Sequence, residues 1–204
     1  ANQSTYWLLF ELLWREYFRW VLLKFGRRLF WPGGLKHNPP TSPFTEKQRP
    51  LFERWCEGRT GMPFVDANMR ELRQTGFMSN RGRQVVASYL VKDLNIEWRR
   101  GAWWFESMLV DYDVASNGGN WAYVAGVGND PREQRYFNVL LQAKRYDKQG
   151  RYVRHWLPEL RELPTPLVHH PFTMSPTEQS QYNCELHKDY PTPDFLPQAW
   201  RKLL

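Results

Sequence analysis

The apolar run from Tyr6 to Phe30 constrains the fold more than any other part of the chain. Its length suggests a membrane span, but Glu11, Arg15, Glu16 and Arg19 interrupt it, and each charge would be costly in hydrocarbon. We therefore predict a buried helix of a globular domain and no transmembrane segment. Because its other residues leave almost no hydrated face, this helix should be central to the fold.

Three charged residues of this run, Glu11, Arg15 and Arg19, recur every four residues and so share one face of the helix. Glu11 precedes Arg15, which is the favourable order for an ion pair, and Trp14 flanks the stripe. On a buried helix, such a stripe indicates either an internal ladder of ion pairs or one wall of a polar ligand cavity. The residues alone leave both interpretations open.

Capping and breaking residues predict further helices along the chain. Among its 204 residues, 42% are hydrophobic, which is typical of a folded globular chain. From Leu163 onwards the sequence has seven prolines and no periodicity. We predict an all-α chain, with a helical region over 1–163 and an extended Pro-rich tail over 164–204. The expected helices are one opened by a Thr45–Gln48 capping box and stopped by Gly58, one from Pro63 to Gly76, one over Met78–Leu94, one over Trp98–Val110, and a short one after a turn at Asp147–Gly150.

The formal charge of +7, from 28 Lys and Arg against 21 Asp and Glu, favours contact with a polyanion but does not require one. The two cysteines, Cys56 and Cys184, are too few and too far apart for a disulfide-stapled fold. No group of residues has metal-ligand spacing, so we expect no metal site. The chain opens with Ala1 and not Met, and we expect further sequence upstream of it.

The stretch from Thr60 to Arg132 concentrates Arg, Asn, Asp, Gly and Trp between helical runs, more densely than a plain core requires. Asn80, Arg83 and Gln84 gather in the first turns of one predicted helix. Those turns carry unpaired N–H groups and the positive end of the helix dipole. They can therefore receive an anion or the polar edge of a ligand.

Two acids, Asp111 and Asp113, follow the predicted helix over Trp98–Val110. In a non-helical segment they can point to different partners, one to an arginine and one to a ligand donor. Capping of the next helix explains them equally well. Gly118 and Gly119 permit either close approach of the backbone to a flat ligand or a tight turn.

Five sequence motifs follow one another along the chain: E-L-L-W-R-E-Y-F-R from Glu11, T-G-M-P-F-V-D-A-N-M from Thr60, T-G-F-M-S-N-R-G-R-Q from Thr75, W-R-R-G-A-W-W-F-E from Trp98 and D-Y-D-V-A-S-N-G-G-N-W from Asp111. In this order they resemble the flavin-binding domain of the photolyase and cryptochrome family. The resemblance spans roughly Tyr6 to Leu163, and the form S-N-R-G-R-Q and the later G-V-G-N-D-P-R-E-Q-R-Y-F are similar to DASH-type cryptochromes.

The resemblance implies an all-helical domain that holds FAD, in which blue light drives electron transfer from the reduced flavin to a pyrimidine dimer in single-stranded DNA. It implies that Arg15 lies beside the cofactor and that Asn80 lies near the flavin and the lesion. It further implies that Arg83 pairs with Asp111, that Asp111 and Asp113 line the flavin and its ribityl chain, and that Asn117 lies near the flavin N5 edge.

By the same resemblance, Glu11 and Trp14 bind and stack on the lesion. Trp55, Trp98 and Trp121 resemble the tryptophan relay that reduces the flavin, a role that spacing alone could not reveal because tryptophans in a helical domain are mostly core residues. The remaining candidates are expected to serve packing only: Trp103, Trp104 and Trp156.

Members of this family carry an α/β antenna domain and further flavin-domain helices upstream, and those helices supply part of the clamp on the FAD phosphates. Without them, the first helix here would expose a large apolar face, which a soluble monomer rarely tolerates. We therefore expect a cover, either the upstream half of the protein or a partner subunit.

Two functions stay open. One is a DASH-type, light-driven flavoprotein, whole or as a fragment, acting on single-stranded or looped DNA or on a signalling partner. The other is a non-catalytic structural subunit of a larger assembly, which could include a membrane complex. The resemblance also suggests an organelle, chloroplast or mitochondrion, as the location.

Overall fold

The computed structural model describes residues 3–37, 39, 41–130, 135–197 and 200 of the chain. Within this part the regular elements are helices, and the β-type pairing is limited to an isolated bridge between Leu186 and Tyr190, so the all-α prediction is confirmed. None of the described helices is long and apolar enough to cross a membrane. The chain divides into unit 1, made of 1–43 and 97–135, and unit 2, made of 44–96 and 136–204.

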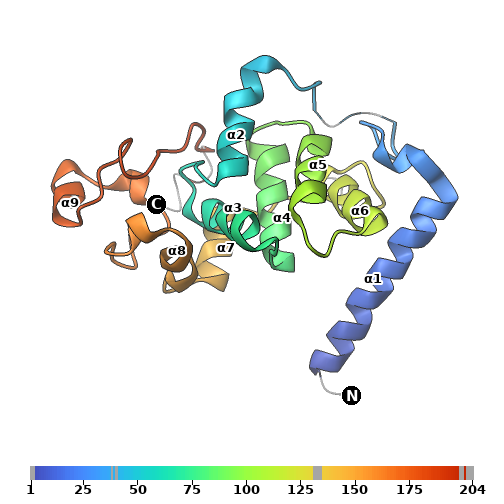
Figure 1. Cartoon of the computed structure of the whole chain (residues 1–204), viewed down its shortest axis with the longest axis horizontal. Helices are drawn as coiled ribbons and strands as arrows, with labels where there is room; N and C mark the ends of the chain where they lie inside the picture. The colour runs from blue at the N-terminus through green and yellow to red at the C-terminus, as the bar shows by residue number, and fades with distance from the viewer. Residues whose placement is uncertain (1–2, 38, 40, 131–134, 198–199, 201–204) are drawn as a thin grey trace. The chain divides into compact units, whose positions relative to one another are not determined.

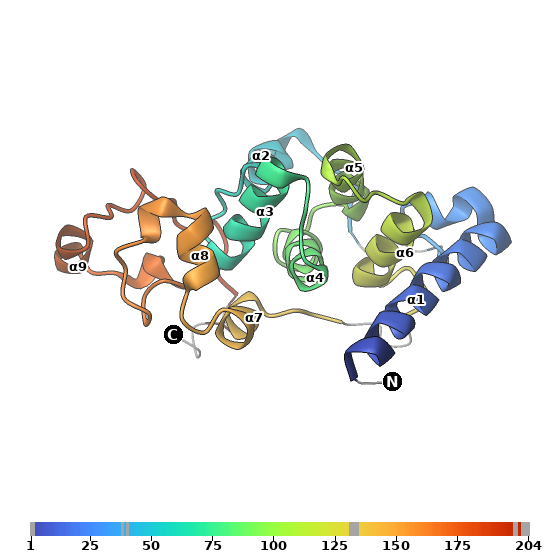
Figure 2. The same ribbon diagram turned by 60° about the horizontal axis from the view of Figure 1, so that its bottom comes forward.

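Unit 1 is built around a helix that lies between two others (Figures 1 and 2). The central helix is α6 (Val114–Ala125), and its neighbours are α1 (Gln3–Phe25), which continues into the 3₁₀ turn η1 (Gly26–Phe30), and α5 (Trp98–Met108). A Cβ at Gly118 would lie 2.5 Å from a ring carbon of Phe30, and one at Gly119 would lie 2.1 Å from a ring carbon of Phe18. Both glycines therefore serve close helix packing inside α6, and not a turn or the approach of a flat ligand.

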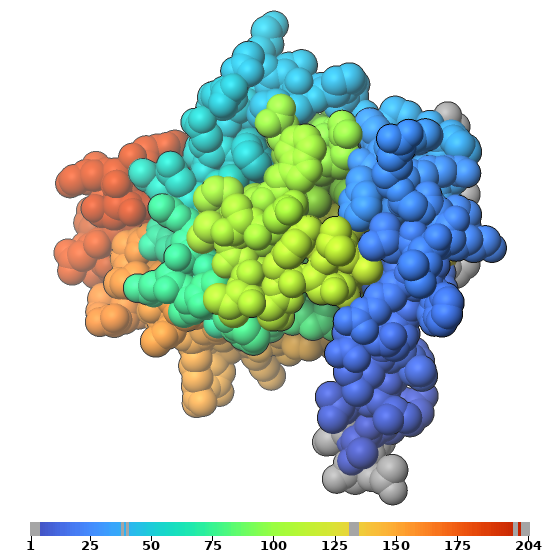
Figure 3. All heavy atoms as spheres, turned by 45° about the vertical axis from the view of Figure 1, so that its right-hand side comes forward, coloured from blue at the N-terminus to red at the C-terminus, as the bar shows by residue number. Residues whose placement is uncertain are grey.

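The first helix, α1, is not buried as predicted. Phe18 and Val21 are its buried apolar residues, whereas Leu8 is 64% exposed and Leu23 is 75% exposed. Figure 3 shows the N-terminal turns of α1 standing clear of α6. The expectation of an uncovered apolar face is confirmed, and we call it the α1 apolar face. Its exposed members are Tyr6, Trp7, Leu8, Leu9, Phe10, Leu12, Leu13, Trp20 and Leu23.

Unit 2 has α3 (Pro63–Thr75) at its centre, in contact with α2, α4, α7 and α8 (Figure 2). The predicted capping box of Thr45 and Gln48 opens the 3₁₀ turn that leads into α2, and Gly58, with φ of 65°, ends that helix. The other helices of unit 2 are η2 (Glu46–Gln48), α2 (Arg49–Glu57), α4 (Asn80–Ser88), the π-helical turn η3 (Tyr89–Asp93), α7 (Val139–Tyr146), α8 (Arg151–Trp156), η4 (Pro158–Leu160), η5 (Pro171–Thr173) and α9 (Pro176–Gln181).

The proline-rich tail is part of unit 2, carries two short helices, η5 and α9, and makes polar contacts with α2 and α3. The Tyr190 hydroxyl donates to the fully buried carboxylate of Asp66, which also accepts from Thr60 N at 2.8 Å. Arg54 Nη1 lies 2.8 Å from Asp194 Oδ1. These contacts fix the tail against α2 and α3 although it has little regular structure of its own.

Candidate functional site

The start of α4 in unit 2 presents the polar group that the sequence placed there. Ser79 Oγ caps the helix by accepting from Gly82 N at 3.1 Å, and Arg83 Nε donates to Met78 O at 2.9 Å. Asn80 is exposed at the first position of the helix. Gln84 Oε1 is buried and has no hydrogen-bond partner among the described residues. A buried acceptor that has no partner among the described residues is suited to a ligand that brings its own donor.

The two acids of unit 1 have different roles. Asp113 Oδ1 accepts from Ser116 N at 2.8 Å and so caps α6, as one of the two interpretations expected. That hydrogen bond to the backbone is the main reason why the pKa of Asp113 lies below its usual value. The Asp113 carboxylate, held ionised by this hydrogen bond, accepts hydrogen bonds but does not donate them. Asp111 is exposed in the connection between α5 and α6.

Asn117 is anchored in unit 1 by its side-chain amide. Its Nδ2 donates to Ala102 O at 3.0 Å, which joins α6 to α5. With the nitrogen side held by α5, the amide cannot turn freely. Its oxygen therefore has a fixed direction, which suits recognition of an N–H group.

The charged stripe of α1 pairs differently from the prediction. Glu16, and not Glu11, takes the arginines: its Oε1 lies 3.1 Å from Arg15 Nη2 and 2.8 Å from Arg19 Nη1. The Arg15 and Glu16 side chains are 48% and 46% exposed, so a buried ladder of ion pairs is excluded. Glu11 is exposed, at the edge of the α1 apolar face.

The predicted pair of Arg83 and Asp111 joins residues of different units, since Arg83 belongs to unit 2 and Asp111 to unit 1. The same holds for Asn80 relative to Asp113 and Asn117. The assembly of these residues around one ligand stays a prediction.

The three predicted relay tryptophans are all buried in their units. Trp55 Nε1 donates to Val86 O at 3.1 Å, and Trp98 Nε1 donates to Pro32 O at 3.0 Å. Trp121 contacts Phe105 edge-on, with 5.1 Å between ring centroids. Buried indoles with satisfied N–H groups are equally typical of core packing and of an electron relay. The relay role stays a prediction.

Trp103 does not serve as core packing, contrary to the expectation. It is 51% exposed, and the guanidinium groups of Arg99 and Arg100 lie 5.7 Å and 5.5 Å from its ring. The buried side of α5 is formed by Trp98, Gly101, Ala102 and Phe105, and Trp103 lies off that side, which explains the error. Trp104 and Trp156 are partly buried, in line with packing.

Unit 1 also contains a group of aromatic side chains that the sequence analysis identified only in part. Trp14 contacts Tyr17 edge-on at 5.5 Å and Tyr123 edge-on at 6.2 Å. The guanidinium carbon of Arg135 lies 4.8 Å from the centroid of the Tyr123 ring. We call Trp14, Tyr17 and Tyr123 the aromatic cluster. No spacing rule identifies Tyr123 or Arg135, because the contacts join α1, α6 and the segment after α6.

The chemistry of these groups fits a flavin. Oxidised and reduced flavins present amide-like donors and acceptors along one ring edge, which carboxylates, carboxamides and guanidinium groups can bind. The unsatisfied Gln84 Oε1 and the anchored amide of Asn117 are observations of this structure that agree with such a ligand. An all-helical fold with these side chains is typical of helical flavin-binding domains.

The comparison with known families agrees. The chain matches the FAD binding domain of DNA photolyase over residues 7–202 and belongs to that family. The resemblance to photolyases and cryptochromes is therefore confirmed.

Its relatives include DASH-type cryptochromes. Cryptochrome DASH from Synechocystis sp. is 58% identical over 193 residues, which is 95% of this chain and 39% of the relative. Cryptochrome DASH, chloroplastic/mitochondrial, from Oryza sativa subsp. japonica is 60% identical over 163 residues, which is 80% of this chain and 28% of the relative. The crystal structure of Synechocystis sp. PCC6803 cryptochrome superposes with a TM-score of 0.91 and 55% identity, over 100% of this chain and 42% of that one. The chain thus spans less than half of the length of these relatives.

Proposed function

We propose that this chain is the FAD-binding part of a DASH-type cryptochrome in which blue light drives electron transfer from the reduced flavin to a pyrimidine dimer in single-stranded DNA. The observation that carries the proposal is the match to the FAD binding domain of DNA photolyase over residues 7–202. Bound FAD would supply light absorption and the transferred electron.

The residues of the chain would hold and orient the flavin. Asn117 is suited to the N5 edge because its amide is anchored, and Asp111 and Asp113 would accept hydrogen bonds from the flavin and its ribityl chain. Arg83 would offset negative charge on the reduced ring, and Asn80 would bridge the flavin and the substrate. Arg15 would lie beside the cofactor, while Trp55, Trp98 and Trp121 would pass electrons to it.

The test of flavin binding uses the purified chain, incubated with FAD and separated from free cofactor by gel filtration. We expect the visible absorption bands of a flavin to remain with the protein. Asn117→Ala should weaken retention about tenfold, since it removes a hydrogen bond to the ring. Asn120→Ala, an exposed position on the same helix, is the matched control and should retain FAD as the wild type does. A colourless chain that takes up no FAD would reject flavin binding by this chain on its own.

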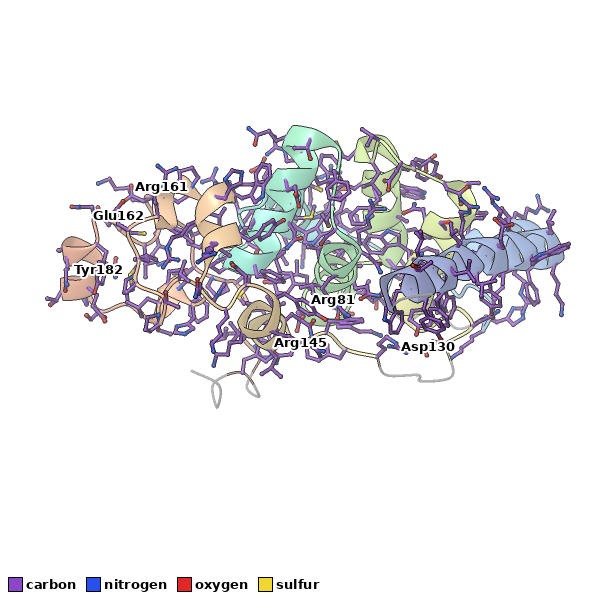
Figure 4. All side chains as sticks on the ribbon, turned by 90° about the horizontal axis from the view of Figure 1, so that it is seen from below. Arg81, Asp130, Arg145, Arg161, Glu162 and Tyr182 are labelled. Atoms are coloured by element: carbon purple, nitrogen blue, oxygen red, sulfur yellow. The ribbon has the colours of Figure 1, made fainter. Side chains whose placement is uncertain are left out.

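A basic surface on unit 2 supports single-stranded DNA as the substrate. The guanidinium groups of Arg81 and Arg145 lie 5.0 Å and 5.4 Å from the ring of Tyr146, and Figure 4 shows both arginines on one face of this unit. Lys148 and Arg151 are exposed in the same region. The acid between Tyr146 and Lys148, Asp147, is buried and accepts from Val153 N, in the first turn of α8, at 3.0 Å. Exposed cations around an exposed aromatic ring are typical of proteins that bind single strands.

The salt dependence of oligothymidylate binding tests this surface. For a single strand, the slope of log K against log salt changes by about 0.7 for each phosphate contact. The double variant Arg145→Gln and Lys148→Gln should therefore reduce the slope by about 1.4. The matched control, Arg49→Gln with Lys188→Gln, removes two exposed cations elsewhere in unit 2 and should leave the slope unchanged. Equal slopes for all three proteins would exclude the basic surface as the binding site.

The exposed residues of the α1 apolar face support a second proposal: another protein surface, the upstream part of a longer cryptochrome, covers this face. The relatives are more than twice as long as this chain, so they contain additional sequence that could provide such a cover. The alternative of a non-catalytic subunit is not favoured, because the relatives carry the name of cryptochromes. Plant relatives are named chloroplastic/mitochondrial, and we propose an organellar location on that basis.

A further inference from the structure

Two adjacent residues, Asn129 and Asp130, connect the segment after α6 to the aromatic cluster of unit 1. In the sequence they belong to the motif N-D-P-R, of which Pro131 and Arg132 lie outside the described residues. Asn129 Nδ2 donates to the hydroxyl of Tyr17 on α1. Asp130 Oδ2 accepts from Arg135 Nε at 2.8 Å, and Figure 4 shows Asp130 next to α1.

The pair of Asp130 and Arg135 is held firmly. The Asp130 side chain is 1% exposed and that of Arg135 is 28% exposed. The hydrogen bond to Asp130 is the main reason why the pKa of Arg135 lies above its usual value. The guanidinium contacts both carboxylate oxygens of Asp130 and is therefore fixed in place. Removing either partner of the pair would leave a poorly compensated charge.

Asn129 and Asp130 are both connected to the aromatic cluster, Asn129 through Tyr17 and Asp130 through Arg135. Arg135, held by Asp130, lies over the face of Tyr123 at 4.8 Å, and Tyr123 contacts Trp14 edge-on at 6.2 Å. On the α1 side, Asn129 holds Tyr17, whose ring lies 5.5 Å from that of Trp14. Asn129 and Asp130 thereby hold the rings on both sides of Trp14.

The rings of the aromatic cluster are partly open to solvent. Trp14 and Tyr17 are 37% and 38% exposed, whereas the Asp130 carboxylate that pairs with Arg135 is buried. Exposed aromatic rings close to a fixed cation suit the stacking of a base and the charge of its phosphate.

We propose that Asn129 and Asp130 are positioning residues that set Trp14, Tyr17 and Tyr123 for the stacking of an unpaired base. This inference rests on the proposed function for its ligand, and it assigns a role to two residues that do not touch the ligand themselves.

A spectroscopic experiment tests the positioning role without any ligand. In protein labelled with 5-fluorotryptophan, the ¹⁹F resonance of Trp14 is identified by its loss in Trp14→Phe. Asp130→Asn should shift this resonance, Arg135→Gln should shift it similarly, and the double variant should add nothing further. Glu185→Gln breaks an exposed ion pair with Lys188, 2.9 Å apart, and as a control should move no resonance. An unchanged Trp14 resonance in Asp130→Asn would overturn the inference.

Binding of single-stranded oligothymidylate tests the ligand. Asp130→Asn should raise the dissociation constant about tenfold, because Arg135 and the stacking rings lose their fixed positions, and Glu185→Gln should not change it. A shifted resonance with an unchanged dissociation constant would overturn the stacking role. A wild-type chain that binds no oligothymidylate would overturn the proposed DNA function. The ¹⁹F resonance of Trp14 in Asp130→Asn would still decide for or against the positioning role.

Discussion

Asp93 is a carboxylic acid that the fold keeps largely out of water. Its Oδ1 accepts the hydroxyl of Tyr136 at 2.9 Å, and its Oδ2 is buried with no hydrogen-bond partner among the described residues. Burial raises the pKa of Asp93 to about 7, because the ionised form loses more solvation than the neutral form. Around neutral pH the folded chain therefore carries a mixture of both forms at this position.

This raised pKa predicts a pH-dependent stability. The unfolded chain has an Asp pKa of about 4, so between about pH 4 and pH 7 the folded state binds the proton and the unfolded state does not. The free energy of unfolding should thus fall as the pH rises through this range. Between pH 5 and pH 8, urea unfolding should show a loss of about 2 kcal/mol in the wild type that Asp93→Asn lacks.

The control for this experiment is Asp189→Asn, which changes an exposed acid. It should reproduce the pH dependence of the wild type. If the curves of Asp93→Asn and the wild type run parallel from pH 5 to pH 8, Asp93 does not titrate near neutral pH in the folded chain.

At the scale of the elements, α6 carries the arrangement of unit 1. Its two glycines allow α1 and η1 to approach, its N-cap Asp113 fixes its start, and its Asn117 joins it to α5. The same helix supplies Tyr123 to the aromatic cluster. A change that moves α6 should therefore affect both the packing of unit 1 and the residues proposed to bind the flavin.

Gly119→Ala tests this packing. The added Cβ would lie 2.1 Å from a ring carbon of Phe18, which is buried. Overpacking costs about 1 to 3 kcal/mol, which exceeds the roughly 1 kcal/mol that alanine gains over glycine inside a helix. The free energy of unfolding should therefore decrease. Asn120→Ala, on the exposed side of α6, should change it by less than about 0.5 kcal/mol. A more stable Gly119→Ala variant would show that α1 does not pack as described.

At the scale of the whole molecule, each unit is assembled from two separate segments of the chain. Neither unit can complete its core until both of its segments have been made. The α1 apolar face adds a second dependence, because its nine large apolar side chains are exposed and large exposed apolar patches usually mark interaction surfaces. The chain by itself should therefore associate through this face.

Sedimentation velocity at increasing protein concentration checks this expectation. The wild-type chain should self-associate, and the triple variant Leu9→Gln, Leu13→Gln, Leu23→Gln should remain monomeric, because it replaces leucines that are 61–75% exposed on α1. Leu141→Gln, which is 48% exposed on α7, is the control and should behave as the wild type. A wild-type chain that stays monomeric throughout would show that the α1 apolar face needs no cover.

The features that depend on a few neighbouring residues could be predicted from the sequence. The capping box of Thr45 and Gln48 and the helix stop at Gly58 were correct because they are decided by local hydrogen bonds and backbone conformation. The family was predicted correctly because its motifs are ordered and specific. The sequence identified Asp111 and Asp113 as candidates for either a ligand contact or a helix cap, but only the fold showed that Asp113 caps α6.

The sequence by itself thus determined the helices that have clear caps and stops, the family and the types of side chain that could bind a flavin, whereas α7 and the two short helices of the tail, η5 and α9, were not predicted. Tertiary structure decided which partners those side chains take and which faces are covered. Glu16 replaced Glu11 as the partner of Arg15, Trp103 proved exposed, and Asn129 and Asp130 were found to hold the aromatic cluster. The physical reason is that burial and pairing depend on which segments pack together, and contacts such as that of Tyr17 with Asn129 join residues far apart in the chain.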